Sequence, residues 1–293
     1  MAAKTYECPG CGASLQQGLT AWHRVCNTCS YEGSVLDGHI QTEQGTEVLD
    51  EALREDGLSH LRQRNFGVLA ALLADIAVAA PDAPRPRLLD VGCAHGWFLE
   101  AARSDFDVTG IEPDFAVGAS AQRRNLPVRL GFFPDVLDRD EYFDVIVFND
   151  VLEHIPDIDS ALKACVRHLS PQGLVVVNAP ARTGVIYRTA GLLAKMGMPG
   201  TFERMWQKDF PSPHVHYLDD HSIKAIASHA GLVPFRTITL PSVSHQGLLA
   251  RIRYDRSVSP LKGMVMATII LAAIPVLRIL PSDIKVWILR RPA

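Results

Sequence analysis

Apolar residues follow two different spacings along the chain, and the change between them divides it. From Glu47 to Ala80 they recur at helical spacing, which predicts one or two helices broken near Gly57. A proline-rich stretch at residues 80–87 ends this segment. After it, short apolar runs rich in β-branched residues are separated, for the most part, by helical stretches. These runs are RLLDVG, FDVTGIEP, PVRLGFF, FDVIVFND and GLVVVNAP.

Strands that are apolar along their whole length are typical of a parallel sheet covered by helices on both faces. The alternation of such runs with helices therefore predicts an α/β fold. In sheets of this kind, ligands bind beyond the carboxyl ends of the strands. We expect the functional residues to follow the apolar runs directly.

Composition permits a sizeable core and makes nucleic acid a less favoured partner. The chain has 293 residues, of which 47% are hydrophobic and 21% charged, and its net charge is -3. This balance gives no whole-protein attraction to nucleic acid. The first residues, MAAKTYECPGCG, hold one lysine and no apolar segment of a secretory signal, so we expect a cytoplasmic protein.

Four cysteines form two pairs with the spacing of zinc knuckles. Cys8 and Cys11 are separated by two residues, as are Cys26 and Cys29. Four thiolates complete a tetrahedral shell without an open position, which predicts a structural zinc ion rather than a catalytic one. We assign residues 1–35 to a zinc ribbon and residues 36–84 to a helical linker.

The stretch LLDVGCAHGWFLEAA combines the end of a strand with glycines and the start of a helix. Asp90, Gly92 and Gly96 give the spacing acid-x-Gly-x-x-x-Gly. Alone, this pattern fits an ordinary tight turn as well as a ligand-binding loop. Glu112 ends the next strand about 20 residues later, where an acid can accept both hydroxyls of a ribose. Phe132 or Phe133, after the third run, could pack on an adenine ring.

In sequence order, LLDVGCAHG, VTGIEPD, FDVIVFNDVLEHIPD, LSPQGLVVVNAP and PHVHYLDDHSIKAIASHAGL resemble the motifs of class I methyltransferases that use S-adenosylmethionine. The resemblance covers residues 85–293. It implies a Rossmann-like, seven-stranded, mostly parallel sheet with a reversed last strand and helices on both faces. It also implies that S-adenosylmethionine is the cofactor.

The resemblance assigns roles to the residues that follow the strands. Asp90, Gly92 and Gly96 would hold the methionine end of the cofactor. Glu112 would bind the ribose, Phe132 would lie by the adenine, and Asn149 would lie near the sulfonium. The family often has glycine where Ala94 stands, and alanine is small enough for the loop to form. The full cofactor-binding set is Asp90, Gly92, Cys93, Ala94, Gly96, Glu112, Pro113, Phe132, Asn149 and Asp150.

Asp150, Glu153 and His154 repeat an acid-x-x-Glu-His pattern after the fourth run. Ubiquinone-type O-methyltransferases have a similar pattern, which there binds a divalent ion beside a catechol. The first acid is the shorter aspartate here, so an ion and a role in shaping the pocket both stay open. Histidine also suits removal of a proton from a hydroxyl acceptor, because its pKa lies near neutrality.

Two further histidines, His214 and His216, occupy alternate positions in PSPHVHYLDD. In an extended segment this spacing puts both on one face. The candidate catalytic residues are therefore Glu153, His154, His214 and His216. For the last two, structural hydrogen bonding is an equal alternative to contact with the acceptor.

Two apolar insertions fall within the methyltransferase-like region. Residues 184–207 are methionine-rich and predict either a helical lid or ordinary core packing. Residues 261–281 contain an uncharged run that is shorter than the ~20 residues of a spanning helix, and basic residues surround it. This second insertion predicts a lid, a dimer contact or a peripheral contact with the inner face of a membrane.

These features predict a methyltransferase, with O-methylation of a small-molecule or lipid-linked acceptor such as a quinone precursor or a glycan intermediate. A sugar C-methyltransferase and an RNA methyltransferase are alternatives, because both can carry an amino-terminal zinc module. A non-catalytic adaptor that binds a partner through the ribbon is the third. Binding of nucleic acid is the least favoured of these, because the chain is acidic outside its last stretch.

Overall fold

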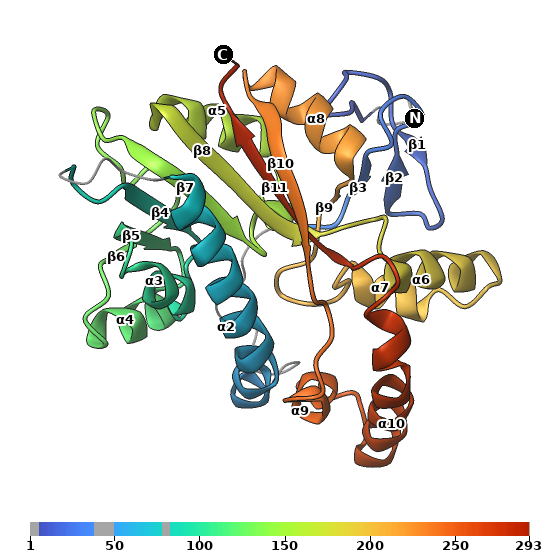
Figure 1. The fold of residues 1–293 in the computed structure, drawn as a ribbon. Helices are drawn as coiled ribbons and strands as arrows, with labels where there is room; N and C mark the ends of the chain where they lie inside the picture. Colours follow the sequence, from blue (N-terminus) through green and yellow to red (C-terminus); the bar gives the residue numbers. More distant parts are fainter. Residues whose placement is uncertain (1–5, 38–49, 78–82, 293) are drawn as a thin grey trace.

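The computed structural model describes residues 6–37, 50–77 and 83–292, and a seven-stranded sheet forms its centre (Figure 1). The strand order is β10-β11-β8-β7-β4-β5-β6. All neighbours are parallel except β11, which runs antiparallel to β8 and β10. The expected seven-stranded sheet with a reversed last strand is confirmed. The strands are β4 (Arg87–Val91), β5 (Asp107–Glu112), β6 (Val128–Leu130), β7 (Phe143–Asn149), β8 (Leu169–Pro180), β10 (Val233–Leu240) and β11 (Ile284–Arg290).

Consecutive residues on the central strands are buried on opposite faces of this sheet, which explains their continuous apolar runs. Leu88 packs with one core cluster and Leu89 with the other, and Val176 and Val177 alternate in the same way. One face is covered by α2 (Glu51–Ile76), α3 (Trp97–Ala102) and α4 (Phe115–Arg123). The opposite face is covered by α5 (Ile158–Arg167) and α8 (Asp220–His229) (Figure 1).

Helix α2 is continuous through Gly57, so the predicted break there is wrong. The glycine serves close packing instead. A Cβ at Gly57 would lie 2.4 Å from the backbone nitrogen of Arg251, in α9 (Leu248–Arg253). A larger residue would therefore force the two helices apart.

The ribbon strands β1 (Gln16–Gln17), β2 (His23–Val25) and β3 (Glu32–Ser34) form a second, antiparallel sheet. A fourth strand, β9 (His216–Tyr217), joins this sheet from more than 180 residues later in the chain and pairs with β3. The buried Glu32 carboxylate adds an ion pair with Arg182, which follows β8. The ribbon is thus bound to the larger sheet by backbone and charged contacts.

The two apolar insertions are helical. Residues 184–207 contain α6 (Val185–Lys195) and α7 (Gly200–Met205), whose side chains pack on Trp22 and Trp206. Residues 261–281 lie largely in α10 (Pro260–Leu277), which projects from the body beside α9 (Figure 1). By length and composition alone α10 could cross a membrane, since it has 18 residues with a mean hydropathy of 1.9. Only 17% of it is buried.

Two glycines of α2 provide a test of the α2–α9 contact. Gly57→Ala should lower the free energy of unfolding by about 1–3 kcal/mol, because the methyl group meets backbone atoms of Arg251. Gly67→Ala should raise it by about 0.5–1 kcal/mol, because nothing lies near that position and alanine favours helix. Denaturant unfolding of both variants measures the difference. Equal effects at the two positions would contradict this packing.

Candidate functional site

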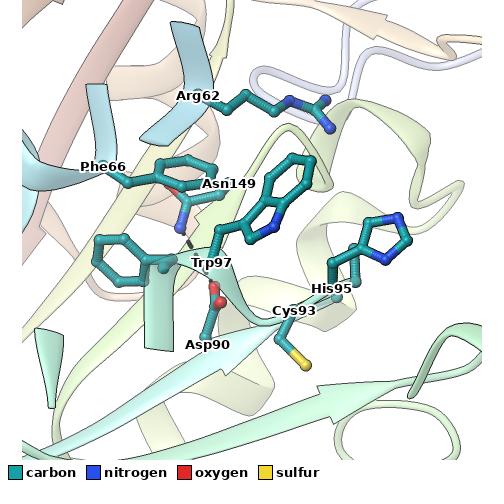
Figure 2. A pocket seen from close by; sticks show the side chains of 10 residues that line it. Arg62, Phe66, Asp90, Cys93, His95, Trp97 and Asn149 are labelled. Atoms are coloured by element: carbon teal, nitrogen blue, oxygen red, sulfur yellow. Dashed lines mark hydrogen bonds between the residues drawn. The ribbon is translucent and has the colours of Figure 1, made fainter. Parts of the chain in front are cut away.

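A pocket lies at the carboxyl ends of β4 and β7, where the glycine loop turns into α3. Its empty volume is about 330 Å³, and helix α2 forms one of its walls (Figure 2). The sequence-predicted residues Asp90, Gly92, Cys93, Ala94 and Asn149 all line it. The remaining lining residues are Arg62, Phe66, His95, Trp97 and Phe98.

The loop needs glycine at two positions for different reasons. Gly92 has a φ of 70°, and a Cβ there would meet Val151 at 2.6 Å. Gly96 has a φ of 74°, and its Cβ would meet Leu126 at 2.4 Å. Ala94 also adopts a positive φ, 45°, a region that favours glycine. The loop forms with alanine in place.

Asp90 is fully buried at the floor of the pocket, at the end of a chain of amides. The Asn149 side chain donates to the Asp90 carboxylate at 3.2 Å (Figure 2), and the Asn178 side chain donates to Asn149 at 3.2 Å. Burial raises the pKa of Asp90 to about 8, although the bond from Asn149 opposes this. A cationic group entering the pocket would favour the ionised carboxylate.

The carboxylate of Glu112, the second acid of the site, lies next to the loop. One carboxylate oxygen accepts the Ala94 N–H and the other accepts the Asp114 N–H, both at 2.8 Å. Each oxygen keeps a further lone pair that could accept a ribose hydroxyl. Burial raises the pKa of Glu112, and the two backbone donors oppose the shift. This geometry fits the role that the sequence predicts.

The predicted adenine side is open at its edge. Phe132 is 59% exposed, so its ring is accessible to a ligand. Phe133 instead packs edge-on against Phe148 with ring centroids 5.9 Å apart, which makes it a core residue. Pro113 is half-buried after Glu112. Of the two phenylalanines, Phe132 is therefore the one placed to meet an adenine.

Sequence reasoning missed the contribution of helix α2 and of two loop residues. Arg62 and Phe66 of α2 line the pocket (Figure 2), and Arg62 forms an ion pair with Asp150 at 3.0 Å. No sequence signal marks these two, because only the docking of α2 brings them to the loop. His95 and Trp97 stack on each other with centroids 5.2 Å apart. His95 lies between Gly92 and Gly96, and Trp97 directly follows Gly96. These positions in the sequence could have identified both residues as part of the site.

A second cluster lies beyond β7, around the short helix η1 (Leu152–His154). Ligand atoms of Glu153, His154 and His214 lie within 4.8 Å of one another. The rings of His154 and His214 are 4.8 Å apart. The structure thus brings together three of the four predicted catalytic residues.

The hydrogen bonds of the two imidazoles define their tautomers. His154 Nδ1 lies 3.0 Å from the carbonyl oxygen of Pro213 and 3.2 Å from the Ser212 hydroxyl. The carbonyl oxygen can only accept, so the proton is assigned to Nδ1 and the Ser212 hydroxyl then accepts as well. Nε2 is then the nitrogen able to take up a proton. His214 Nε2 accepts from the Gln207 amide at 2.9 Å. Burial, reinforced by His154, lowers the pKa of His214 well below its usual value and keeps that ring neutral.

Glu153 is buried, and neither of its carboxylate oxygens has a hydrogen-bond partner within the described part of the chain. Burial raises its pKa well above the usual value, and the charge of Asp150 adds to the shift. Asp150 itself is engaged by Arg62 and does not belong to the cluster. Of the acid-x-x-Glu-His pattern, Glu153 and His154 thus come together with His214, and Asp150 does not join them.

His216 does not join this cluster. Its Nδ1 lies 2.5 Å from the Tyr31 hydroxyl, and its Nε2 lies 2.8 Å from the Ile155 carbonyl oxygen. Burial lowers the pKa of His216 to about 4. Both ring nitrogens are used in hydrogen bonds, which favours the structural alternative for His216.

The four cysteines of the ribbon gather at one point. Their sulfur atoms lie within 4.8 Å of one another, with the pair Cys8 and Cys29 at 3.4 Å and the pair Cys11 and Cys26 at 3.5 Å. Sulfurs bound to one zinc ion at about 2.3 Å would be about 3.8 Å apart. The arrangement fits a tetrahedral ion. Cys93 and Cys165 are buried elsewhere in the core.

Comparisons with known proteins agree with this geometry. A family model described as a methyltransferase domain matches residues 59–235, more than half of the chain. The chain is similar to the ubiquinone biosynthesis O-methyltransferase of Rickettsia conorii, with 26% identity over 179 residues, covering 59% of each protein. Similarity to the Alkalilimnicola ehrlichii protein of that name is 34% over 117 residues, covering 37% of this chain and 47% of the relative.

These matches span only about half the length of the curated relatives. Among solved structures, the fold is similar to that of a SAM-dependent methyltransferase from Thermotoga maritima. The TM-score is 0.54 at 15% identity, and the alignment covers 83% of this chain and 95% of the other. At that identity the likeness shows the fold.

Glu112 offers a test of the cofactor site. Glu112→Ala should weaken binding of S-adenosylmethionine by about 10- to 150-fold, the loss expected for charge-assisted hydrogen bonds worth ~1.5–3 kcal/mol. The matched control is Asp114→Ala, which removes the N-cap of α4 but not the ribose acceptor. Titration calorimetry measures both. Unchanged affinity in Glu112→Ala would remove this residue from the site.

Proposed function

The chain belongs to the methyltransferase domain family and is an S-adenosylmethionine-dependent methyltransferase, and we propose that it methylates a hydroxyl oxygen of a small-molecule or lipid-linked acceptor. When bound, the cofactor supplies an activated methyl group, so the protein must align the acceptor and remove its proton. The observation that carries the proposal is the tautomer of His154, whose Nδ1 proton is held by Pro213.

His154 is the proposed base. As the acceptor oxygen forms its bond to the methyl group, the hydroxyl proton passes to His154 Nε2. The positive charge on the resulting imidazolium lies within 4.8 Å of Glu153 and His214. An ionised Glu153 carboxylate would stabilise that charge, whereas neutral His214 adds no opposing charge. The reaction would thus give a role to the buried Glu153 carboxyl, which has no hydrogen-bond partner within the described residues.

A divalent ion at the same three residues is the second candidate. The oxygens of Glu153, which have no hydrogen-bond partner within the described residues, favour it. One carboxylate and two imidazoles suit zinc, manganese or iron better than magnesium. Glu153, His154 and His214 would hold such an ion, which would lower the pKa of a bound hydroxyl.

The curated relatives and the helices beside the site indicate the class of acceptor. A quinone precursor agrees with the names of the curated relatives, and a glycan intermediate agrees with a lipid-linked acceptor. The apolar helices α6 and α7, which follow β8 on the ligand side of the sheet, favour an acceptor with an apolar part. Sugar C-methylation stays an alternative. RNA methylation is less favoured because the net charge is -3.

His154→Ala should lower turnover by about 10²- to 10⁴-fold, the usual contribution of a general base. Affinity for S-adenosylmethionine should be unchanged, because His154 does not line the cofactor pocket. Release of S-adenosylhomocysteine with a catechol acceptor measures turnover, and the exposed His221→Ala is the control. Turnover within threefold of wild type in His154→Ala would exclude this base.

Metal content distinguishes the ribbon from the second cluster. We expect one zinc ion per chain, bound by the four cysteines and lost in Cys8→Ser. Elemental analysis of freshly purified wild type, Cys8→Ser and Glu153→Gln measures this. A second metal that persists in Cys8→Ser and disappears in Glu153→Gln would establish the ion at Glu153, His154 and His214. Zinc-free wild type would refute the ribbon ion.

A further inference from the structure

Helix α10 has two apolar faces, and only one of them is covered. The inner face is buried at Gly263, Ala267 and Ile274, and Ala267 packs with Leu248 and Ile252 of α9. A Cβ at Gly263 would lie 2.9 Å from the side chain of Arg253, so this contact is close. The outer face is exposed and almost entirely apolar. It consists of Leu261, Met264, Val265, Thr268, Ile269, Leu271, Ala272, Pro275 and Val276.

The apolar surface continues past the end of the helix. Ile279 is 83% exposed and Leu280 is 39% exposed. An exposed apolar surface of this extent marks an interaction site in a soluble protein. Its outer residues are the ones that need a partner, because the inner face already has one.

Charge identifies the kind of partner. Between residues 256 and 282 there is no aspartate or glutamate, and the three charged residues are all basic. Arg256 and Lys262 lie at the start of α10 and Arg278 at its end, and all three are exposed. In the described structure none of them forms an ion pair. An apolar strip with basic residues at both ends complements an anionic lipid surface.

Both ends of α10 are attached to the same body, which excludes a spanning arrangement in this fold. Before the helix, Asp255 forms an ion pair with Arg204 of α7. After it, the Asp283 carboxylate accepts the backbone N–H of Tyr187 at 2.8 Å, and the Val185 N–H donates to the Pro281 carbonyl at 3.0 Å. The segments on both sides of this helix of 18 residues, about 27 Å long, are therefore attached to the same body.

We propose that the outer face of α10 docks in the plane of an anionic membrane surface. Leu261, Val265, Ile269 and Val276 would enter the acyl boundary, and Arg256, Lys262 and Arg278 would contact lipid phosphates. Because α10 is tied to α6 and α7, docking brings the helices that follow β8 to the membrane. Docking would thus bring the acceptor side of the enzyme to a lipid-linked acceptor. That part of the inference rests on the proposed function.

A second copy of the chain fits this face less well. In a symmetric dimer the same patch meets itself. Either orientation of two α10 helices would place basic ends against basic ends, with no acid between residues 256 and 282 to pair with them. A membrane supplies the negative charge that a second copy lacks.

Sedimentation of the full-length protein with vesicles tests the proposal without cofactor or acceptor, so its result is independent of the proposed reaction. Wild type should pellet with phosphatidylglycerol-rich vesicles, stay in solution with phosphatidylcholine vesicles, and be released by salt. Replacing Val265, Ile269 and Val276 together by serine should abolish pelleting. These side chains are 52%, 63% and 53% exposed, so the fold should survive.

A triple serine variant at exposed apolar residues on other elements is the matched control. Val68, Tyr142 and Phe235 are 51%, 47% and 42% exposed, and this variant should pellet like wild type. Replacing Arg256, Lys262 and Arg278 by glutamine should weaken binding to anionic vesicles about fivefold per residue.

Two outcomes would overturn the proposal. One is wild type that stays in the supernatant with anionic vesicles at low salt. The other is a wild-type dimer that the α10 serine variant converts to monomer, because the face would then bind a second copy.

Discussion

The buried carboxylate of Glu32 holds the ribbon, the main sheet and the insertion helices together. It accepts from Arg182 Nε at 2.8 Å and lies 3.1 Å from His23 Nε2, and the Tyr187 hydroxyl also donates to it. Arg182 donates in addition to Asp219, the N-cap of α8, at 2.7 Å. An isolated buried charge would be costly, so these partners must stay assembled for the carboxylate to stay ionised. The contacts with Arg182 and the other donors hold the pKa of Glu32 below its usual value against burial.

This constraint reaches the second cluster through the backbone. Strand β3 pairs with β9, and the Ser34 N–H donates to the Val215 carbonyl at 3.0 Å. Val215 in turn donates from its N–H to the Glu153 carbonyl at 2.7 Å. The segment that carries His214 is therefore held between the ribbon and η1. The ribbon therefore helps to hold His214 opposite His154.

The sequence predicted the parts of the site that follow strands directly. Asp90, Gly92 and Glu112 could be found because a parallel sheet gathers the carboxyl ends of its strands at one edge. Arg62 and Phe66 could not, because they sit on a helix whose docking depends on packing against α3 and α9. The same limit explains Gly57, where a residue that usually breaks helices allows a close helix contact.

The histidines show where local pattern stops being sufficient. Alternation placed His214 and His216 on one face, which holds for an extended segment considered alone. Pairing of β9 with β3 then gave each ring a different neighbour, so that His216 meets Tyr31 and His214 meets His154. Periodicity cannot supply this difference, because the partner strand comes from residues more than 180 positions earlier. The geometry of the second cluster thus depends on a contact between the amino-terminal ribbon and a segment more than 180 residues later.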